Sequence, residues 1–259
     1  MDLINQEHWD ENYSNIDGIL SSSKNDPLIE WIEYTHKCLP HATCLEIGVY
    51  PGRYIYEFGE RNHEIYGIDL TPKVLELNKL FSDKNLKVGG FEQKNFFDLN
   101  PDKKYGIVYS LGFIEHFNDY KSVIQRHCNL VEDNGILFLA TPNFSGAIQY
   151  FLHKLIDSEN IKRHNLKSMN VDEWSSFLSQ NGFEIIQAGY IGGFSFWYEK
   201  QKRNVFQRFI KEFMRHSMPV WQKIFRSPSK LYSPYCGIIA RKISEKDNLD
   251  YNHNSTIIN

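Results

Sequence analysis

Short runs of apolar residues alternate with segments of helical periodicity over the first 140 positions. The runs have the length of strands and are bounded by Gly, Pro, Asn or Asp. The predicted strands are Thr43–Ile47, Glu64–Leu70, one within Leu86–Phe97, Tyr105–Leu111 and Ile136–Ala140. Amphipathic helices are predicted at Leu28–Leu39, Arg53–Gly59, Pro72–Phe81 and Asp119–Val131, the last ended by Asn134 and Gly135. This alternation predicts a doubly wound α/β fold, with a mostly parallel sheet and helices on both faces.

The second half of the chain continues the pattern less regularly. Helices are predicted at Ala147–Ile156 and Val171–Gln180, and strands at Phe183–Ala188 and Tyr235–Ala240. No internal repeat or low-complexity segment is present. The sheet is therefore expected to gain two further strands after residue 180.

Residues 197–230 differ from the rest because they are rich in Lys, Arg and aromatic residues. Four apolar residues fall at helical spacing, and a second short apolar face follows at 221–225. The first group is Phe206, Phe209, Ile210 and Phe213. Three interpretations stay open: a helical pair docked on the sheet with solvated basic residues, a surface attracted to an anionic membrane, or a cap over a phosphate-bearing acceptor.

Length and charge narrow the classes of protein. A chain of 259 residues can bury a full α/β core. A formal net charge of -3 disfavours a general nucleic-acid partner. None of the four cysteines is spaced as in a metal site or disulfide framework, so reduced thiols are expected. We see no secretory signal and no apolar run of about 18 residues, and expect a soluble cytoplasmic protein.

The segment from Thr43 to Tyr54 carries the first chemical signal. It is a strand, then a turn between Gly48 and Gly52, then the start of a helix, and the next strand ends at Asp69. A doubly wound sheet holds a nucleoside in this way, because the acid can accept hydrogen bonds from both ribose hydroxyls. A dinucleotide site needs a third glycine and a P-loop needs Gly-Lys-Ser/Thr, and the turn has neither.

Five motifs, in order, resemble those of the class I S-adenosylmethionine-dependent methyltransferases of the small-molecule and saccharide type. The resemblance covers roughly residues 40–190 and the last strand. The motifs are Leu45-Glu-Ile-Gly-Val-Tyr-Pro-Gly-Arg53, Asp69, Tyr109-Ser-Leu-Gly-Phe-Ile-Glu-His-Phe117, Gly135-Ile-Leu-Phe-Leu-Ala-Thr-Pro-Asn143 and Phe177-Leu-Ser-Gln-Asn-Gly-Phe-Glu184. The resemblance implies a seven-stranded sheet of order 3-2-1-4-5-7-6, with strand 7 antiparallel and a helical insertion before it.

The resemblance also implies a cofactor, S-adenosyl-L-methionine, with S-adenosyl-L-homocysteine as the product. The residues that it places around the cofactor are Glu46, Gly48, Tyr50, Gly52, Asp69, Leu70, Asn95, Phe96 and Leu111. The chain departs from the family at three positions. Tyr50 replaces a glycine, Asn95 stands where an acid usually meets the adenine amino group, with Asp98 nearby, and Gly106 replaces an aspartate at the start of strand 4.

Methyl transfer to a hydroxyl or amine needs alignment with the donor and, for some acceptors, a base. The candidate bases are Glu115, His116 and His164, and no metal site is predicted. Glu115 and His116 follow strand 4, at the carboxyl edge where ligands bind in such sheets. The alternative for this pair is a helix-capping or core role. The alternative for His164 is a solvated loop histidine beside Lys162 and Arg163.

These predictions combine into a single methyltransferase domain over residues 1–259. Its parts are an N-terminal helical lid at 1–40, the core at 41–192, a basic aromatic helical insertion at 193–232, the last strand at 233–242 and a tail at 243–259. The predicted reaction is methyl transfer to an oxygen or nitrogen atom of a small molecule. A saccharide or glycolipid precursor is the favoured acceptor. The predicted location is the cytoplasm, with peripheral contact at the inner membrane face through 197–230.

Two other functions stay open. A non-catalytic protein that binds S-adenosylmethionine or S-adenosylhomocysteine in a degenerate site is favoured by Tyr50, Asn95 and Gly106. An NAD-dependent enzyme is disfavoured by the missing third glycine.

Overall fold

The computed structural model describes residues 16, 26–199 and 203–244. Most of the predicted N-terminal lid and nearly all of the predicted tail therefore lie outside the described residues. The division of the chain into five parts stays a prediction. All four cysteines are free thiols, as expected.

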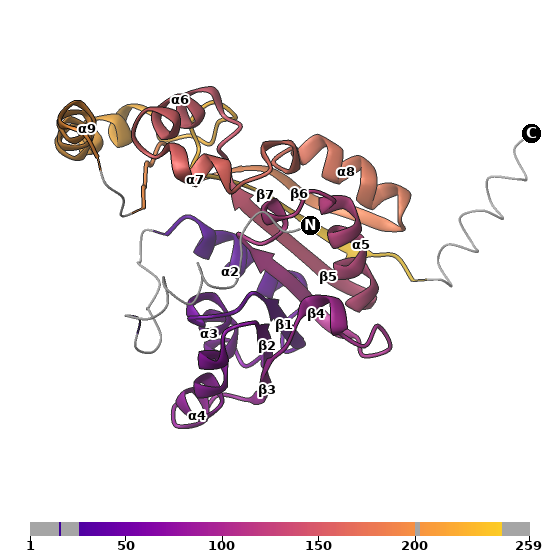
Figure 1. The fold of residues 1–259 in the computed structure, drawn as a ribbon. Helices are drawn as coiled ribbons and strands as arrows, with labels where there is room; N and C mark the ends of the chain where they lie inside the picture. The colour runs from indigo at the N-terminus through magenta and orange to yellow at the C-terminus, as the bar shows by residue number, and fades with distance from the viewer. Residues whose placement is uncertain (1–15, 17–25, 200–202, 245–259) are drawn as a thin grey trace, which may run out of the picture.

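A seven-stranded sheet forms the centre of the molecule, with strand order β3-β2-β1-β4-β5-β7-β6 (Figure 1). Only β7 runs antiparallel to its neighbours. The strands are β1 Thr43–Ile47, β2 Glu64–Asp69, β3 Val88–Gln93, β4 Tyr105–Leu111, β5 Val131–Pro142, β6 Phe183–Ile191 and β7 Tyr235–Lys242. The predicted order and the predicted direction of the last strand are confirmed.

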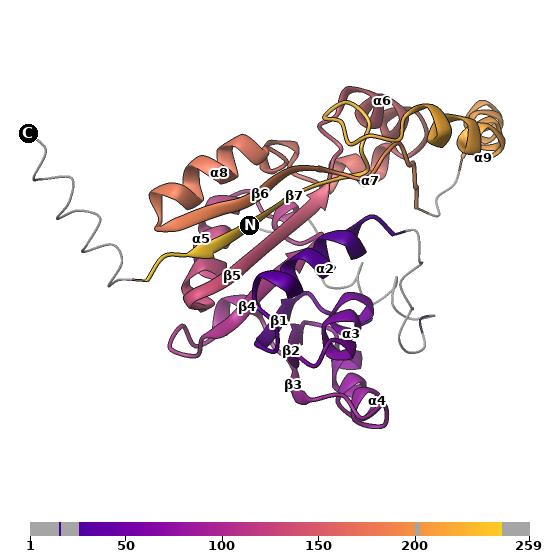
Figure 2. The same ribbon diagram turned by 180° about the vertical axis from the view of Figure 1, so that it is seen from behind.

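Helices cover both faces of the sheet (Figures 1 and 2). They are α2 Leu28–Cys38, α3 Arg53–Glu60, α4 Glu76–Ser82, α5 Tyr120–Leu130, α6 Ala147–Ile156, α7 Ser158–Lys162, α8 Val171–Gln180 and α9 Val205–Ile224, with 3-10 turns η1 Pro72–Leu75, η2 Phe96–Asp98, η3 Ile114–His116 and η4 Leu166–Ser168. Helices α2, α3 and α4 bury Trp31, Phe58 and Phe81 in one core. Helices α5 and α8 bury Ile124 and Trp174 in the core of the other face.

The prediction that Asn134 and Gly135 end the helix before β5 is wrong. Helix α5 ends at Leu130, and β5 begins at once with Val131. Asn134 has a left-handed φ of 63° inside β5, where the pairing with β4 shifts register between Tyr105 and Ile107. The Asn-Gly pair therefore forms an irregularity within a long strand instead of a helix end.

The basic aromatic segment forms one helix, which corrects the predicted helical pair. Helix α9 runs through Pro219, a residue that in a sequence usually indicates a helix end. Its start is fixed by a capping box, in which Asn204 accepts from the Gln207 amide and Gln207 accepts from the Asn204 amide. The helix packs on α6 through a small apolar cluster, which among the described residues includes none from a strand. Within the described ranges, no helix combines the length and apolar character needed to cross a membrane.

The strand order creates a crevice at the carboxyl edge of the sheet. The chain leaves β1 toward β2 and β3 on one side, and later returns to place β4 on the other side. The loops after β1 and β4 diverge at such a switch point, and ligands of doubly wound folds bind there. The fold thus brings the turn at 48–52 and the segment 111–116 together.

Candidate active site

The loop after β1 contains two glycines whose backbone adopts the left-handed conformation, so no side chain covers the backbone at these positions. Gly48 has a φ of 73° and Gly52 a φ of 89°. A Cβ at Gly48 would lie 3.1 Å from the ring of Phe113 in the loop after β4, and a Cβ at Gly52 would lie 2.9 Å from Phe81. Neither position accommodates a side chain without displacement. Gly48 is therefore needed for the close approach of the two loops, and Gly52 for the packing of the turn against α4.

Asp69 ends β2 at the same edge and holds the loop in place. Its Oδ2 accepts a hydrogen bond of 3.0 Å from the amide of Tyr50, and its Oδ1 accepts one of 3.1 Å from the amide of Thr71. A carboxylate has about four acceptor positions, and ribose hydroxyls are among the donors that it can bind.

Tyr50 occupies the place of the family's middle glycine as a buried residue. Its hydroxyl donates to the carbonyl of Ile16 at 2.9 Å, and its amide donates to Asp69. The side chain therefore ties a residue of the N-terminal segment to the loop after β1.

Glu46 is buried beneath this loop. It accepts a hydrogen bond of 2.8 Å from the hydroxyl of Tyr109 on β4. Burial raises the pKa of Glu46 to about 8, so the carboxyl is mostly protonated at neutral pH. Glu46 therefore connects β1 to β4 in the layer below the crevice.

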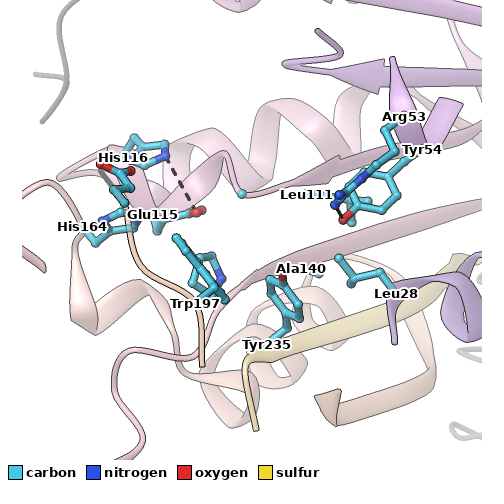
Figure 3. Close-up of a pocket in the computed structure, with 13 residues that line it drawn as sticks. Leu28, Arg53, Tyr54, Leu111, Glu115, His116, Ala140, His164, Trp197 and Tyr235 are labelled. Carbon is cyan, nitrogen blue, oxygen red and sulfur yellow. Dashed lines mark hydrogen bonds and ion pairs between the residues drawn. The ribbon is translucent and has the colours of Figure 1, made fainter. Parts of the chain in front are cut away.

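A cavity of about 260 Å³ opens at the carboxyl ends of β4 and β5 and at the amino end of the antiparallel β7 (Figure 3). All three predicted bases, Glu115, His116 and His164, line it, and of the predicted cofactor residues it includes Leu111. The remaining lining residues are Leu28, Arg53, Tyr54, Gly112, Ala140, Pro142, Trp197, Glu199 and Tyr235. Figure 3 shows Glu115 and the two histidines at one end of the cavity, with Arg53 and Tyr54 at the other.

Backbone carbonyls fix the tautomers of both histidines. The Nδ1 of His116 donates to the carbonyl of Arg163 at 3.2 Å, and the Nδ1 of His164 donates to the carbonyl of Asn160 at 2.7 Å. The unprotonated nitrogen of each neutral ring is therefore Nε2. The Nε2 of His116 lies 3.8 Å from Oε1 of Glu115, and the two rings are 4.7 Å apart.

Burial dominates the electrostatics of this group. It raises the pKa of Glu115 to about 8, and neither carboxyl oxygen has a hydrogen-bond partner among the residues that the structure describes. Burial and the neighbouring His116 lower the pKa of His164 to about 3. At neutral pH the cavity therefore holds a neutral His164 beside a mostly protonated Glu115.

Comparison with known proteins decides the family. The model of a family described as "Methyltransferase domain" matches residues 24–188, more than half of the chain. The chain belongs to this methyltransferase family. The predicted family and fold are confirmed, as is S-adenosylmethionine as the cofactor of this family.

Curated relatives of this methyltransferase are similar over part of their length. The ubiquinone biosynthesis O-methyltransferases of Pelagibacter ubique (strain HTCC1062) and Rhodopseudomonas palustris (strain BisB5) are each 24% identical over 147 residues. The match covers 57% of this chain, 60% of the first relative and 56% of the second. The chain thus aligns with less than two thirds of each relative.

Solved structures support the fold of the methyltransferase. The Burkholderia thailandensis 1,6-didemethyltoxoflavin-N1-methyltransferase, with bound 1,6-didemethyltoxoflavin and S-adenosylhomocysteine, has a TM-score of 0.54 at 14% identity and covers 85% of this chain and 80% of its own. The magnesium protoporphyrin IX methyltransferase of Synechocystis PCC 6803, with bound S-adenosylhomocysteine, has a TM-score of 0.53 at 14% identity. The match covers 91% of this chain and 93% of that structure. At such identities the likeness concerns the fold alone.

The other predicted cofactor residues of the methyltransferase lie outside the cavity. Leu70 is exposed just after β2. The Asn95 side chain accepts from the Phe97 amide at 2.9 Å and so begins η2. Phe96 is buried against Phe113 and His127 in the core. Their contacts with the cofactor stay predictions.

Gly106, which stands where the family often has an aspartate, lies far from the cavity. It is the second residue of β4, at the strand end opposite to Leu111. Five residues of strand separate the two positions by about 16 Å. A Cβ at Gly106 would lie 2.7 Å from that of Ala42, which explains why no larger residue fits.

Glu115, His116 and His164 are also the group whose atoms come closest to a metal site in the part of the chain that the structure describes. One ligand atom of each lies within 4.8 Å of the others. Zinc bonds of about 2.1 Å place tetrahedral ligand atoms about 3.4 Å apart, so the three side chains would have to move inward to hold an ion. The predicted lack of a metal stays a prediction.

Sequence reasoning missed most of the cavity wall of the methyltransferase. Trp197 and Glu199 come from the segment after β6, and Tyr235 begins β7. No spacing pattern links these residues to His116, because they are about 80 or more positions away along the chain. A signal for Arg53 and Tyr54 was present, since these residues begin the helix that follows the glycine turn.

Proposed function

We propose that this methyltransferase moves a methyl group from S-adenosylmethionine to an oxygen or nitrogen of a small molecule bound in the cavity beside His116. The crevice suits the cofactor because Gly48 lets the loops after β1 and β4 approach closely, and because Asp69 ends β2 at this edge, where a carboxylate can accept hydrogen bonds from ribose hydroxyls. The turn at 48–52, Asp69, Leu70 and Leu111 would hold it. The bound cofactor supplies an activated methyl group.

The observation that supports this reaction most directly is the fixed tautomer of His116. Its Nε2 can accept the proton of an acceptor hydroxyl or amine, because Nδ1 is engaged with the carbonyl of Arg163. Positive charge on His116 favours ionisation of Glu115 at 3.8 Å, so the two groups can share the proton. His164 is the weaker base, since its low pKa opposes protonation. It is suited to accept a hydrogen bond that orients the acceptor.

The proposed acceptor is a saccharide or glycolipid precursor. Trp197 and Tyr235 present aromatic walls to the cavity, while Glu115 and the histidines form a polar end (Figure 3). Aromatic faces pack on the apolar face of a sugar ring, and polar groups bind its hydroxyls. A phenol is the second candidate, because the same walls suit an aromatic ring and the curated relatives are named as O-methyltransferases of ubiquinone biosynthesis. We propose a cytoplasmic location, at the inner membrane face.

Methyl transfer can be tested with labelled S-adenosylmethionine and a panel of nucleotide sugars, glycolipid precursors and phenols, with incorporation followed by mass spectrometry. The proposal expects label in a saccharide or glycolipid, and loss of labelling in His116→Gln. Label in phenols alone would favour the second candidate. Calorimetry that shows cofactor binding, with no transfer to any acceptor, would instead support a non-catalytic binding protein.

A further inference from the structure

Helix α9 presents a row of large apolar side chains to solvent. Val205, Phe206 and Phe209 are 83%, 62% and 69% exposed. The row continues along the helix, with Phe213, Val220 and Ile224 all more than half exposed. Successive positions in a helix turn by about 100°, which places these six side chains within one arc of about 100°. Monomeric proteins seldom leave such a stripe uncovered.

The stripe is distinct from the face that attaches α9 to the molecule. Ile210, Met214, Met218 and Trp221 lie about a third of a turn away and join the apolar cluster with α6. Met214 is buried, and the stripe residues do not belong to this cluster. Packing of α9 on α6 therefore does not explain the stripe.

Basic residues border the stripe on its other side. Arg208, Lys211 and Arg215 lie about 60° to 120° beyond the edge of the stripe. Glu212, which forms an ion pair of 2.7 Å with Arg215, lies between them and the stripe, and Lys223 lies within the arc of the stripe itself. Residues 203–226 contain six Lys or Arg and one acid, Glu212, although the whole chain has a formal net charge of -3. Apolar residues flanked by cations are the pattern of a helix that lies in the headgroup region of an anionic bilayer.

We propose that the exposed face of α9 docks on an anionic lipid bilayer. The apolar stripe enters the interface, and the flanking guanidinium and ammonium groups meet lipid phosphates. A second copy of the chain fits less well, because pairing two such faces would bring two sets of cations together. This inference goes beyond the proposed reaction, since docking requires neither cofactor nor acceptor. It also lies outside the segment that the family model matches.

The position of α9 would bring a docked bilayer close to the cavity. Helices α6 and α9 form one end of the molecule, on the side of the sheet's carboxyl edge (Figures 1 and 2). Trp197 and Glu199 line the cavity only a few residues before α9 begins. Phe151 on α6 is also exposed. A bilayer at α9 would therefore lie near the part of the chain that shapes the cavity.

Vesicle sedimentation with the full-length protein tests the proposal. Vesicles of phosphatidylcholine alone are compared with vesicles containing about a third phosphatidylglycerol. We expect binding at least about tenfold tighter to the anionic vesicles, weakened severalfold by 0.5 M salt as an order-of-magnitude guide. The triple variant Phe206→Gln/Phe209→Gln/Phe213→Gln should lose at least about tenfold in affinity.

The matched control is Leu75→Gln, which removes an exposed apolar side chain on η1, in a separate part of the molecule, and should bind as the wild type does. Circular dichroism and thermal unfolding establish that the triple variant is folded; the three side chains are exposed, so the fold should persist. Equal binding of the folded triple variant, or no binding of the wild type to anionic vesicles, would overturn the proposal. Dimerisation seen by light scattering and lost in the triple variant would assign the face to a second copy instead. Failure of methyl transfer leaves these readouts unaffected.

Discussion

His116 and His164 present their Nε2 atoms in the cavity because two backbone carbonyls hold their Nδ1 protons. Both carbonyls come from the segment that follows β5, while His116 itself follows β4. The reactivity of a residue in a recognisable motif thus depends on contacts that the motif does not include. The sequence predicted the residues of the base, but it could not predict which nitrogen would be available.

Substitution of His116 tests its assignment as the base. His116→Gln should lower kcat by about 10²-fold to 10⁴-fold, because the proton acceptor is lost. The affinity for S-adenosylhomocysteine, measured by calorimetry, should change little, since the cofactor crevice lies at the loop after β1. His216→Gln, at an exposed histidine on α9, is the matched control and should keep full activity on a water-soluble acceptor. An unchanged kcat in His116→Gln would refute the assignment.

The buried carboxyls should make stability depend on pH. Burial raises the pKa of both Glu115 and Glu46 to about 8, so the native state keeps protons that the unfolded chain releases near pH 4.5. Their stabilisation is complete below pH 4.5 and is lost as the pH rises to 8. His127 and His164, with pKa values lowered to about 4 and 3, act oppositely and reduce stability as the pH falls below 6.5.

Between pH 6.5 and 8 the two carboxyls dominate this balance. The free energy of unfolding should fall by about 1.4 kcal/mol per pH unit for each carboxyl, measured by urea unfolding. Glu115→Gln should roughly halve this slope. Glu60→Gln, at an exposed position of α3, should leave the slope as in the wild type. Identical slopes for all three proteins would show that Glu115 is already ionised in the native state.

At the scale of elements, periodicity predicted the regular parts well. The predicted ranges of β4, α6 and α8 match the structure residue for residue. The errors fall where a local signal competes with tertiary packing. Asn134-Gly135 resembles a helix end but is held inside β5, and Pro219 resembles a break but lies within α9. Pairing with β4 and packing on α6 outweigh these local preferences.

The turn between β1 and α3 tolerates little change in its geometry. Gly52→Ala should lower the free energy of unfolding by about 1–3 kcal/mol, because the left-handed backbone disfavours a Cβ and Phe81 crowds it. Urea unfolding measures the loss. Glu60→Ala, at the exposed end of α3, is the control and should change stability by less than about 0.5 kcal/mol. A neutral Gly52→Ala would mean that the turn relaxes freely.

At the scale of the whole molecule, the sheet order was predictable because five motifs that resemble those of one family occur in the same order along the chain. The cavity was only partly predictable, since its wall combines residues of α2, α3, β5, β7 and the segment after β6. Trp197 and Tyr235 meet His116 through the folding of the entire sheet. A motif in the sequence does not show which distant residues lie close together in the folded protein.

Cofactor binding should stabilise the whole domain. At S-adenosylhomocysteine concentrations of 100 times Kd, the free energy of unfolding should rise by about 2.7 kcal/mol, which raises Tm by several degrees. Asp69→Asn should reduce the shift, because an amide is a poorer acceptor for ribose hydroxyls than a carboxylate. NAD at the same concentration should produce no shift. Thermal unfolding measures all three, and a shift with NAD alone would reverse the choice of cofactor.

The hydrogen bond between His116 and Arg163 has a consequence for how such enzymes can be recombined. The histidine belongs to the strand-and-helix scaffold, but the atom that sets its protonation belongs to the segment inserted after β5. A chimera that keeps the scaffold and exchanges the insertion would retain the imidazole of His116 but lose the carbonyl that fixes its tautomer. Exchange of substrate specificity between relatives therefore requires that the carbonyl at position 163 be transplanted together with the pocket wall.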